Sequence, residues 1–142
     1  GVSQIDGGTK IELGSYSEEN SDEKDLIRGQ FRINDSRKLN EIIDELLDQD
    51  MIPSFCTACY RIGRTGEHFM EFSVPGFIKR YCTPNAILTL TEYLVDYAPE
   101  NTAVKGWEVI GKNIDKIDDL KLKTSLLTKI EMIKIGQRDL YY

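Results

Sequence analysis

Residues 82–98 have the sequence CTPNAILTLTEYLVDYA, and this stretch decides the fold. Thr83 supplies a capping hydroxyl, and Pro84 occupies the first helical position, where the missing N–H of proline costs nothing. The proline that follows Ala98 keeps the helix from running further. The sequence therefore predicts a helix from Thr83 to about Ala98, with Cys82 immediately ahead of its N-terminus.

Upstream of this stretch, apolar residues recur at three- and four-residue steps, which is the spacing of one helix face. Asp35 or Ser36 supplies an N-cap ahead of them, and Pro53 lies beyond them. The apolar positions are Leu39, Ile42, Ile43, Leu46, Leu47 and Met51. We expect an amphipathic helix over about 36–50 that is ended by Pro53.

Downstream, the chain over 100–135 also has helical spacing. We expect breaks at Gly106 and Gly111, with Gly136 as the C-cap and 138–142 as a tail. Two apolar stripes are predicted to be core. They are Trp107, Ile110, Ile114 and Ile117 in one, and Leu122, Leu126, Leu127, Ile130 and Ile133 in the other.

The remaining segments have weaker signals. We expect 52–60 to be irregular and 65–72 to form one short helix. Near the start, 2–5 alternates apolar and polar residues, which is typical of a strand, and 14–28 is acidic and expected to be a solvated loop. A lone strand needs a sheet, so we expect its partners upstream and interpret the chain as truncated. The predicted fold is mainly α, with one strand at its start.

Length and charge argue against several functional classes. The 142 residues are enough for one domain at about 100–200 residues per domain. The formal net charge of −6 argues against nucleic-acid binding, which depends mostly on attraction to phosphates. No apolar stretch approaches the ~18 residues of a membrane span, and nothing near Gly1 has the pattern of a signal peptide. We expect a cytoplasmic protein that binds neither nucleic acid nor membrane.

Chemistry is expected in the middle of the chain. Residues 52–83 carry 2 acidic and 4 basic residues, and they hold all three cysteines and the single histidine, His68. The cysteines, Cys56, Cys59 and Cys82, follow the pattern C-x2-C-x22-C. A CxxC pair places two thiolates near enough to hold one metal centre, and both zinc sites and iron–sulfur clusters use it.

Two other interpretations of the cysteines are weaker. A disulfide would leave an odd thiol, and the chain lacks the cysteine density of a secreted scaffold. A thioredoxin-like pair should start a helix after a strand, whereas this CxxC follows Pro53 and precedes Gly63. Two metal sites therefore stay open. Structural zinc needs four ligands, so His68 would complete a Cys3His set; an iron–sulfur cluster on three thiolates would leave one iron open to another ligand.

The charges around the cysteines favour the cluster. Thiolates and cluster together are anionic, and four basic residues lie close in sequence. They are Arg61, Arg64, Lys79 and Arg80. The amides and dipole of the helix expected after Cys82 would add to this effect. The alternative remains a zinc-stabilised interaction module with no catalytic role.

Three short sequence motifs around the cysteines resemble those of one enzyme family. They are CTACYR at 56–61, RTGEHFM at 64–70 and CTPNA at 82–86. They are similar to the C-terminal region of the radical S-adenosylmethionine (SAM) tyrosine lyases that mature FeFe hydrogenases, and the resemblance covers nearly the whole chain.

The resemblance implies a domain organisation. Residues 1–16 would be the remnant of the end of a radical-SAM (β/α) barrel, including its last strand, and 17–35 would be an acidic connecting loop. Residues 36–142 would be a helical accessory domain around an iron–sulfur loop.

The resemblance also implies a cofactor and a function. Cys56, Cys59 and Cys82 would bind a 4Fe-4S cluster whose open fourth iron site links, through a cysteine-like amino acid, to an additional iron. Carbon monoxide and cyanide would be assembled there into an Fe-CO-CN precursor of the hydrogenase active site. The expected partners are the upstream barrel of the same protein and the hydrogenase maturation machinery.

In the full-length lyase, a second 4Fe-4S cluster and S-adenosylmethionine generate a radical that cleaves tyrosine to p-cresol and dehydroglycine, the source of carbon monoxide and cyanide. The CxxxCxxC motif of that cluster is absent from this chain. We therefore expect the chain alone not to cleave tyrosine, and we assign it no catalytic residue. His68 lies in the RTGEHFM motif. The family's histidine ligand to the additional iron comes from the barrel, so no role is transferred to His68.

Overall fold

The computed structural model describes residues 37–67, 71 and 75–142, and the mainly α prediction is confirmed there. The chain divides into two compact units, Gly1–Ile42 and Ile43–Tyr142. The helices are α2 (Leu39–Asp48), α3 (Ala58–Arg61), α5 (Pro75–Phe77), the π-helix η2 (Ile78–Cys82), α6 (Thr83–Asp96), α7 (Glu100–Asp115) and α8 (Leu120–Lys134). The predicted strand at 2–5 and the acidic loop at 14–28 lie outside the described residues.

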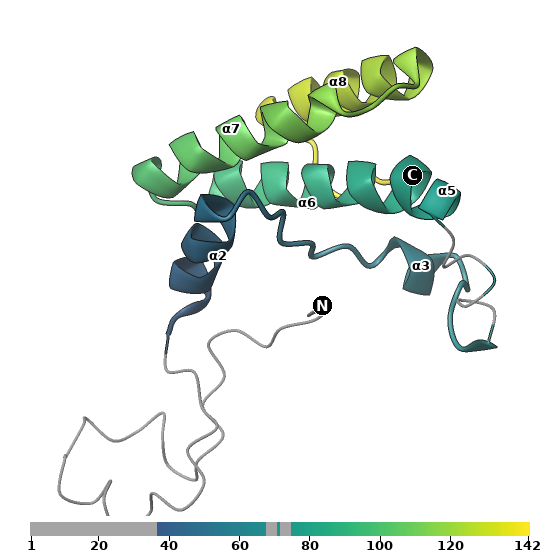
Figure 1. The fold of residues 1–142 in the computed structure, drawn as a ribbon, viewed down its shortest axis with the longest axis horizontal. Coiled ribbons are helices and arrows are strands. Elements are labelled where there is room, and N and C mark those ends of the chain that lie inside the picture. Colours follow the sequence, from purple (N-terminus) through teal and green to yellow (C-terminus); the bar gives the residue numbers. More distant parts are fainter. Residues whose placement is uncertain (1–36, 68–70, 72–74) are drawn as a thin grey trace, which may run out of the picture. The chain divides into compact units, whose positions relative to one another are not determined.

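Helix α6 is the centre of the larger unit, with α7 and α8 running beside it (Figure 1). Ile87, Leu88 and Leu90 are completely buried in α6. The core cluster comprises Ile43, Leu47, Ile87, Leu88, Leu90, Leu94, Val109, Ile110, Ile114, Leu126, Ile130 and Ile133. The two predicted apolar stripes therefore supply much of the core, although Leu127 is 45% exposed.

The glycines of α7 do not break it, contrary to the sequence prediction. The helix is continuous from Glu100 to Asp115. A Cβ atom at Gly106 would lie 2.5 Å from Leu94 Cδ2, so the missing side chain lets α7 approach α6 closely. The packing gained by this approach outweighs the cost of about 1 kcal/mol for glycine inside a helix.

Helix α6 begins at Thr83 as predicted, but its N-terminus is not free. The chain is already helical from Pro75, and the Thr83 N–H bonds to the Ile78 carbonyl, five residues back. Cys82 has helical φ and ψ of −69° and −44°, and no side chain caps the helix there. The expectation of a free helix N-terminus beside Cys82 is therefore wrong, because a π-turn carries the preceding helix into α6.

Helix α2 ends before Pro53 for a local reason. Asp50 has a left-handed φ of 55°, and the Met51 N–H bonds to the Leu46 carbonyl at 2.9 Å. Beyond this turn, 51–57 is irregular as predicted, but Cys59 lies in the short helix α3. The short helix predicted over 65–72 falls largely on residues outside the described part of the chain.

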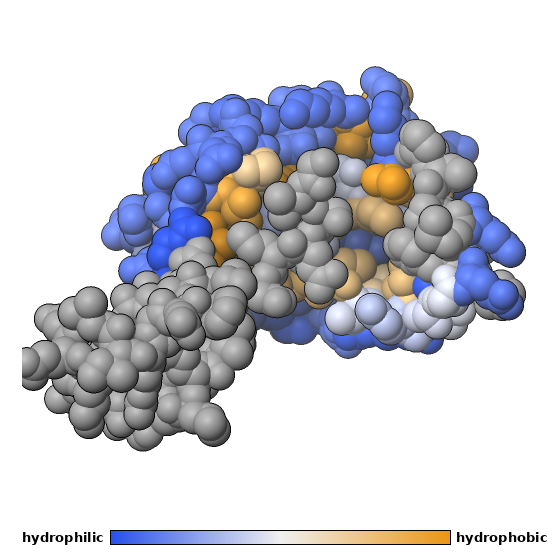
Figure 2. Space-filling model, turned by 60° about the horizontal axis from the view of Figure 1, so that its bottom comes forward, coloured by the Kyte–Doolittle hydropathy of each residue, from blue (hydrophilic) through white to orange (hydrophobic). Residues whose placement is uncertain are grey.

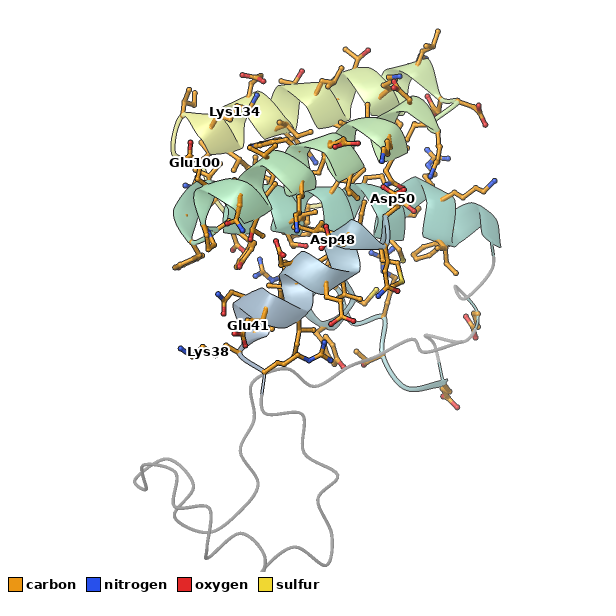
Figure 3. The ribbon with its side chains drawn as sticks, turned by 60° about the vertical axis from the view of Figure 1, so that its left-hand side comes forward. Lys38, Glu41, Asp48, Asp50, Glu100 and Lys134 are labelled. Atoms are coloured by element: carbon orange, nitrogen blue, oxygen red, sulfur yellow. The ribbon has the colours of Figure 1, made fainter. Side chains whose placement is uncertain are left out.

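Carboxylates in the second half of α2 and just after it pair with lysines of α7. Lys105 Nζ donates to Asp44 Oδ2 at 2.8 Å and to Asp48 Oδ2 at 2.9 Å. Lys112 Nζ donates to Asp50 Oδ1 at 2.7 Å. Figure 3 labels Asp48 and Asp50 beside α7. These ion pairs, together with the buried Ile43 and Leu47, attach the end of α2 to the bundle.

The last residues are fixed on the bundle, although the sequence indicates only a tail. Gly136 has a φ of 103°, and its N–H bonds to the Ile133 carbonyl at 3.0 Å, as expected of a C-cap glycine. The chain then returns along α6 and α8, where Arg138 pairs with Asp96. We call Arg138–Tyr142 the C-terminal strap. None of the described helices is both long and apolar enough to cross a membrane.

Candidate metal site

The three predicted ligands are free cysteines, and each is half-buried. Cys56 lies in the irregular segment 51–57, Cys59 lies in α3, and Cys82 is the last residue of η2. The candidate ligands therefore come from two segments, one that carries Cys56 and Cys59 and one that ends at Cys82.

The irregular segment that carries Cys56 is held on α6. The Phe55 N–H donates to Thr89 Oγ1 at 3.3 Å, and the Phe55 ring centroid lies 6.1 Å from that of Tyr93. Thr89 and Tyr93 are four residues apart, so they lie on one face of α6. That face provides both a polar and an aromatic anchor for the residue immediately before Cys56.

Backbone amides surround the CxxC turn. The Ala58 N–H donates to Cys56 Sγ at 3.4 Å, and Ala58 itself is 3% exposed. The Arg64 N–H donates to the Cys59 carbonyl at 2.9 Å, after Gly63 has reversed the chain with a φ of 71°. An N–H aimed at a cysteine sulfur stabilises negative charge on it.

Electrostatics connects the three thiols. Burial is the main factor that raises the pKa of Cys82, and negative charge on Cys59 and on Cys56 raises it further. The Arg64 guanidinium acts in the opposite direction and lowers the pKa of Cys82. Cys82 therefore lies within electrostatic reach of Cys59 and Cys56, although it comes from a separate segment.

Two of the four expected basic residues act at this site. The Arg64 guanidinium lies 4.8 Å from the Phe77 ring centroid and 5.5 Å from that of Tyr81, so it holds the CxxC segment against the turn that ends in Cys82. Arg61 pairs with Asp139 at 2.7 Å. That hydrogen bond is the main factor that raises the pKa of Arg61, and the nearby Cys56 contributes to the rise.

The other two basic residues face elsewhere. Lys79 and Arg80 line a cavity of about 500 Å³ between the η2–α6 junction and the α7–α8 turn, together with Lys116. None of the three cysteines lines this cavity.

Apolar side chains also border the cysteine segments. Phe55, Tyr60 and Ile62 are 43%, 78% and 46% exposed. Figure 2 shows a face on which apolar surface gathers between hydrophilic margins.

The described side chains form no preassembled site for a metal ion. Across 37–67, 71 and 75–142, no three His, Cys, Asp or Glu side chains are arranged to hold one metal ion. Zinc needs its thiolates about 2.3 Å from one point, whereas a 4Fe-4S cluster takes each thiolate on a different iron and so accepts more widely spaced ligands. His68, which zinc would require, lies outside the described residues.

Sequence reasoning missed the residues that tie the site to the rest of the bundle. Asp139 reaches Arg61 from the C-terminal strap, and the buried Asn85 binds the backbone of Tyr142 at the strap's other end. No local pattern could have identified them, because each contact joins residues more than fifty positions apart.

Comparisons with known proteins give one informative result. No protein-family model matches the sequence, and no curated protein matches it. A solved structure described as the crystal structure of HydG, a maturase of the [FeFe]-hydrogenase, matches with a TM-score of 0.83 and 40% sequence identity. The match covers 100% of this chain and 30% of the HydG chain. This chain is therefore similar, over its whole length, to about a third of a hydrogenase maturase.

Proposed function

We propose that the chain is the auxiliary cluster domain of a FeFe-hydrogenase maturase, with Cys56, Cys59 and Cys82 as the ligands of a 4Fe-4S cluster. The observation that carries the proposal is the presence of three free thiols, with Cys82 within electrostatic reach of the other two, in a chain 40% identical to part of HydG. The sequence motifs around the same cysteines agree with it.

The cluster, when bound, supplies an iron with an open coordination position at which an additional iron, carbon monoxide and cyanide are collected as substrates of precursor assembly. The protein's own residues hold and tune it. The Ala58 N–H donates to Cys56 Sγ, while Arg61 and Arg64 place positive charge near the thiols. Positive charge and N–H donors both favour the more negative, reduced state of such a site.

The whole protein, in this proposal, has an upstream radical-SAM barrel that cleaves tyrosine to p-cresol and dehydroglycine. Residues 1–16 would belong to the end of that barrel, 17–35 would connect, and 36–142 would form the cluster domain. The chain lacks the CxxxCxxC motif, so cleavage is assigned to the barrel and not to this domain. The partners would be the barrel and the hydrogenase maturation machinery, in the cytoplasm.

Metal and sulfide analysis of the anaerobically reconstituted chain tests the proposal. We expect about four irons and four sulfides per chain, a broad brown absorption and a 4Fe-4S electron paramagnetic resonance (EPR) signal after reduction. Cys82→Ala should lose or alter that signal. Tyr60→Phe, which changes an exposed neighbour of Cys59, should leave it unchanged.

Two results would contradict the proposal. One is a single zinc per chain without visible absorption, with unfolding by chelator; this is the outcome that a structural zinc module predicts. The other is an unchanged cluster signal in Cys82→Ala.

A further inference from the structure

The C-terminal strap is anchored on α6 close to Cys82. The Tyr142 N–H donates to Asn85 Oδ1 at 2.8 Å, and Asn85 Nδ2 donates to the Tyr142 carbonyl at 3.3 Å. Asn85 is 3% exposed and lies three residues after Cys82 on α6. A buried amide that is fully committed to one backbone segment fixes that segment, because leaving the amide unpaired would be costly.

The strap has an unusual backbone at Asp139. This residue has a left-handed φ of 69°, a region that residues other than glycine rarely adopt. Its N–H donates to Glu92 Oε1 at 2.6 Å, and its carboxylate accepts from Arg61 at 2.7 Å. A strained conformation persists only where its contacts hold it, so these contacts fix the direction of the Asp139 carboxylate.

Arg61 connects this carboxylate to the CxxC turn. It is the last residue of α3, two positions after Cys59, and its guanidinium also lies 5.5 Å from the ring centroid of Tyr141 in the strap. The strap therefore contacts the chain beside Cys59 at one point and beside Cys82 at another. Apart from the stacking of Arg64 on Phe77 and Tyr81, this is a second link between the two cysteine segments.

We propose that Asp139 and Asn85 are positioning residues of the candidate metal site, and that the C-terminal strap holds the CxxC turn in register with Cys82. The assignment rests on the proposed function only for the identity of what the cysteines bind. The strap acts through Arg61 and the start of α6.

The decisive variant is Asp139→Asn, because asparagine tolerates the left-handed backbone while the charge that attracts Arg61 is lost. The matched control is Asp115→Asn, which removes a similarly exposed ion pair, to Lys123 at 3.0 Å, from outside the strap. The readout on the metal-free full chain is backbone amide hydrogen exchange over 58–64, with the alkylation rate of Cys59 measured in parallel.

We expect exchange over 58–64 and alkylation of Cys59 to be at least about twofold faster in Asp139→Asn, while exchange in the interior of α7 is unchanged. Asp115→Asn should match the original chain. Asn85→Ala should produce the same change, and if that variant does not fold, Asp139→Asn decides alone. Equal exchange in Asp139→Asn and the control would overturn the proposal.

The iron-loaded chain supplies the functional readout. We expect Asp139→Asn to release iron to a chelator several-fold faster than Asp115→Asn, with an altered EPR line shape, and Asp139→Glu to restore part of the retention. Faster exchange with unchanged iron release would overturn the positioning role. A chain that takes up no iron would contradict the proposed function, whereas hydrogen exchange would still decide whether the strap holds the turn.

Discussion

At the scale of single residues, Arg61 and Arg64 are the charges that should set the redox properties of the site. Each guanidinium lies within electrostatic reach of a thiol, Arg61 near Cys56 and Arg64 near Cys82. Positive charge stabilises the reduced cluster, which is the more negative state. Replacing both arginines with glutamine should therefore lower the reduction potential, by roughly tens of millivolts.

A redox titration followed by EPR measures this effect. The control replaces Lys116 and Lys121 with glutamine, which removes the same net charge. Lys116 lines the cavity that Lys79 and Arg80 also line, and Lys121 lies on α8. An unchanged or higher potential in the arginine variant would contradict the electrostatic role.

Gly106 and Gly111 of α7 form a natural matched pair for packing. A Cβ at Gly106 would lie 2.5 and 2.6 Å from the two Cδ atoms of Leu94, which is 5% exposed and has little room to move. Gly111 has nothing within 4 Å of its Cβ position. We expect Gly106→Ala to lower the free energy of unfolding by about 1–3 kcal/mol through overpacking, and Gly111→Ala to raise it by up to ~1 kcal/mol through helix propensity.

Urea denaturation of the two variants separates these effects, because both make the same chemical change in the same helix. Equal stability of Gly106→Ala and Gly111→Ala would contradict the close packing of Gly106 in α7 against Leu94 in α6.

At the scale of elements, the attachment of α2 to α7 should depend on pH. The hydrogen bond from Lys105 is the main factor that lowers the pKa of Asp44, and the Thr102 hydroxyl, 2.8 Å away, lowers it further. A carboxyl whose pKa is lower in the folded state stabilises the fold above its unfolded pKa of about 3.9, and this contribution is lost as the pH falls through the folded value. Asp44→Asn should therefore destabilise the chain at pH 7 by roughly 1 kcal/mol and should flatten the acid side of its stability profile.

Thermal unfolding between about pH 7 and pH 2.5 checks this expectation, since the range spans the unfolded pKa and values below it. Asp118→Asn serves as the control because it removes the same charge from an exposed position between α7 and α8. The role of the α2–α7 contact would be refuted if Asp44→Asn followed the control at every pH.

At the scale of the whole molecule, the sequence predicts what local chemistry controls. Apolar spacing and proline positions predict helices close to α2, α6, α7 and α8. The CxxC pattern and the sequence motifs around it identify the cysteines as candidate ligands. Contacts distant in sequence account for what was missed. The continuous α7 depends on Leu94 beside Gly106, and the fixed C-terminal strap depends on Asn85 and Glu92. The π-helix that ends at Cys82 could not be predicted from capping patterns either, because Thr83-Pro84 is typical of a helix start.

The likeness to part of a larger maturase leads to a prediction for the full-length protein, resting on the proposed function. If the thiols hold an auxiliary cluster and the barrel performs the cleavage, the two activities should separate. Replacing Cys56, Cys59 or Cys82 with alanine should leave p-cresol formation within about twofold of the original enzyme, because these residues lie outside the barrel. Activation of the hydrogenase should fall by more than the roughly 10–100-fold that loss of a partner of a metal ligand costs, because here the ligand itself is lost.

Both activities should be measured on the same preparation, since p-cresol release then reports an intact barrel while hydrogenase activation reports the precursor. Tyr60→Phe again provides the control, because it alters the CxxC turn at an exposed ring without removing a ligand. Normal hydrogenase activation by Cys82→Ala would remove the cysteines from the assembly step. Loss of p-cresol together with activation would instead mean that the cysteine domain supports the fold of the barrel, and only a variant that keeps cleavage while losing activation would establish a separate role for the three thiols.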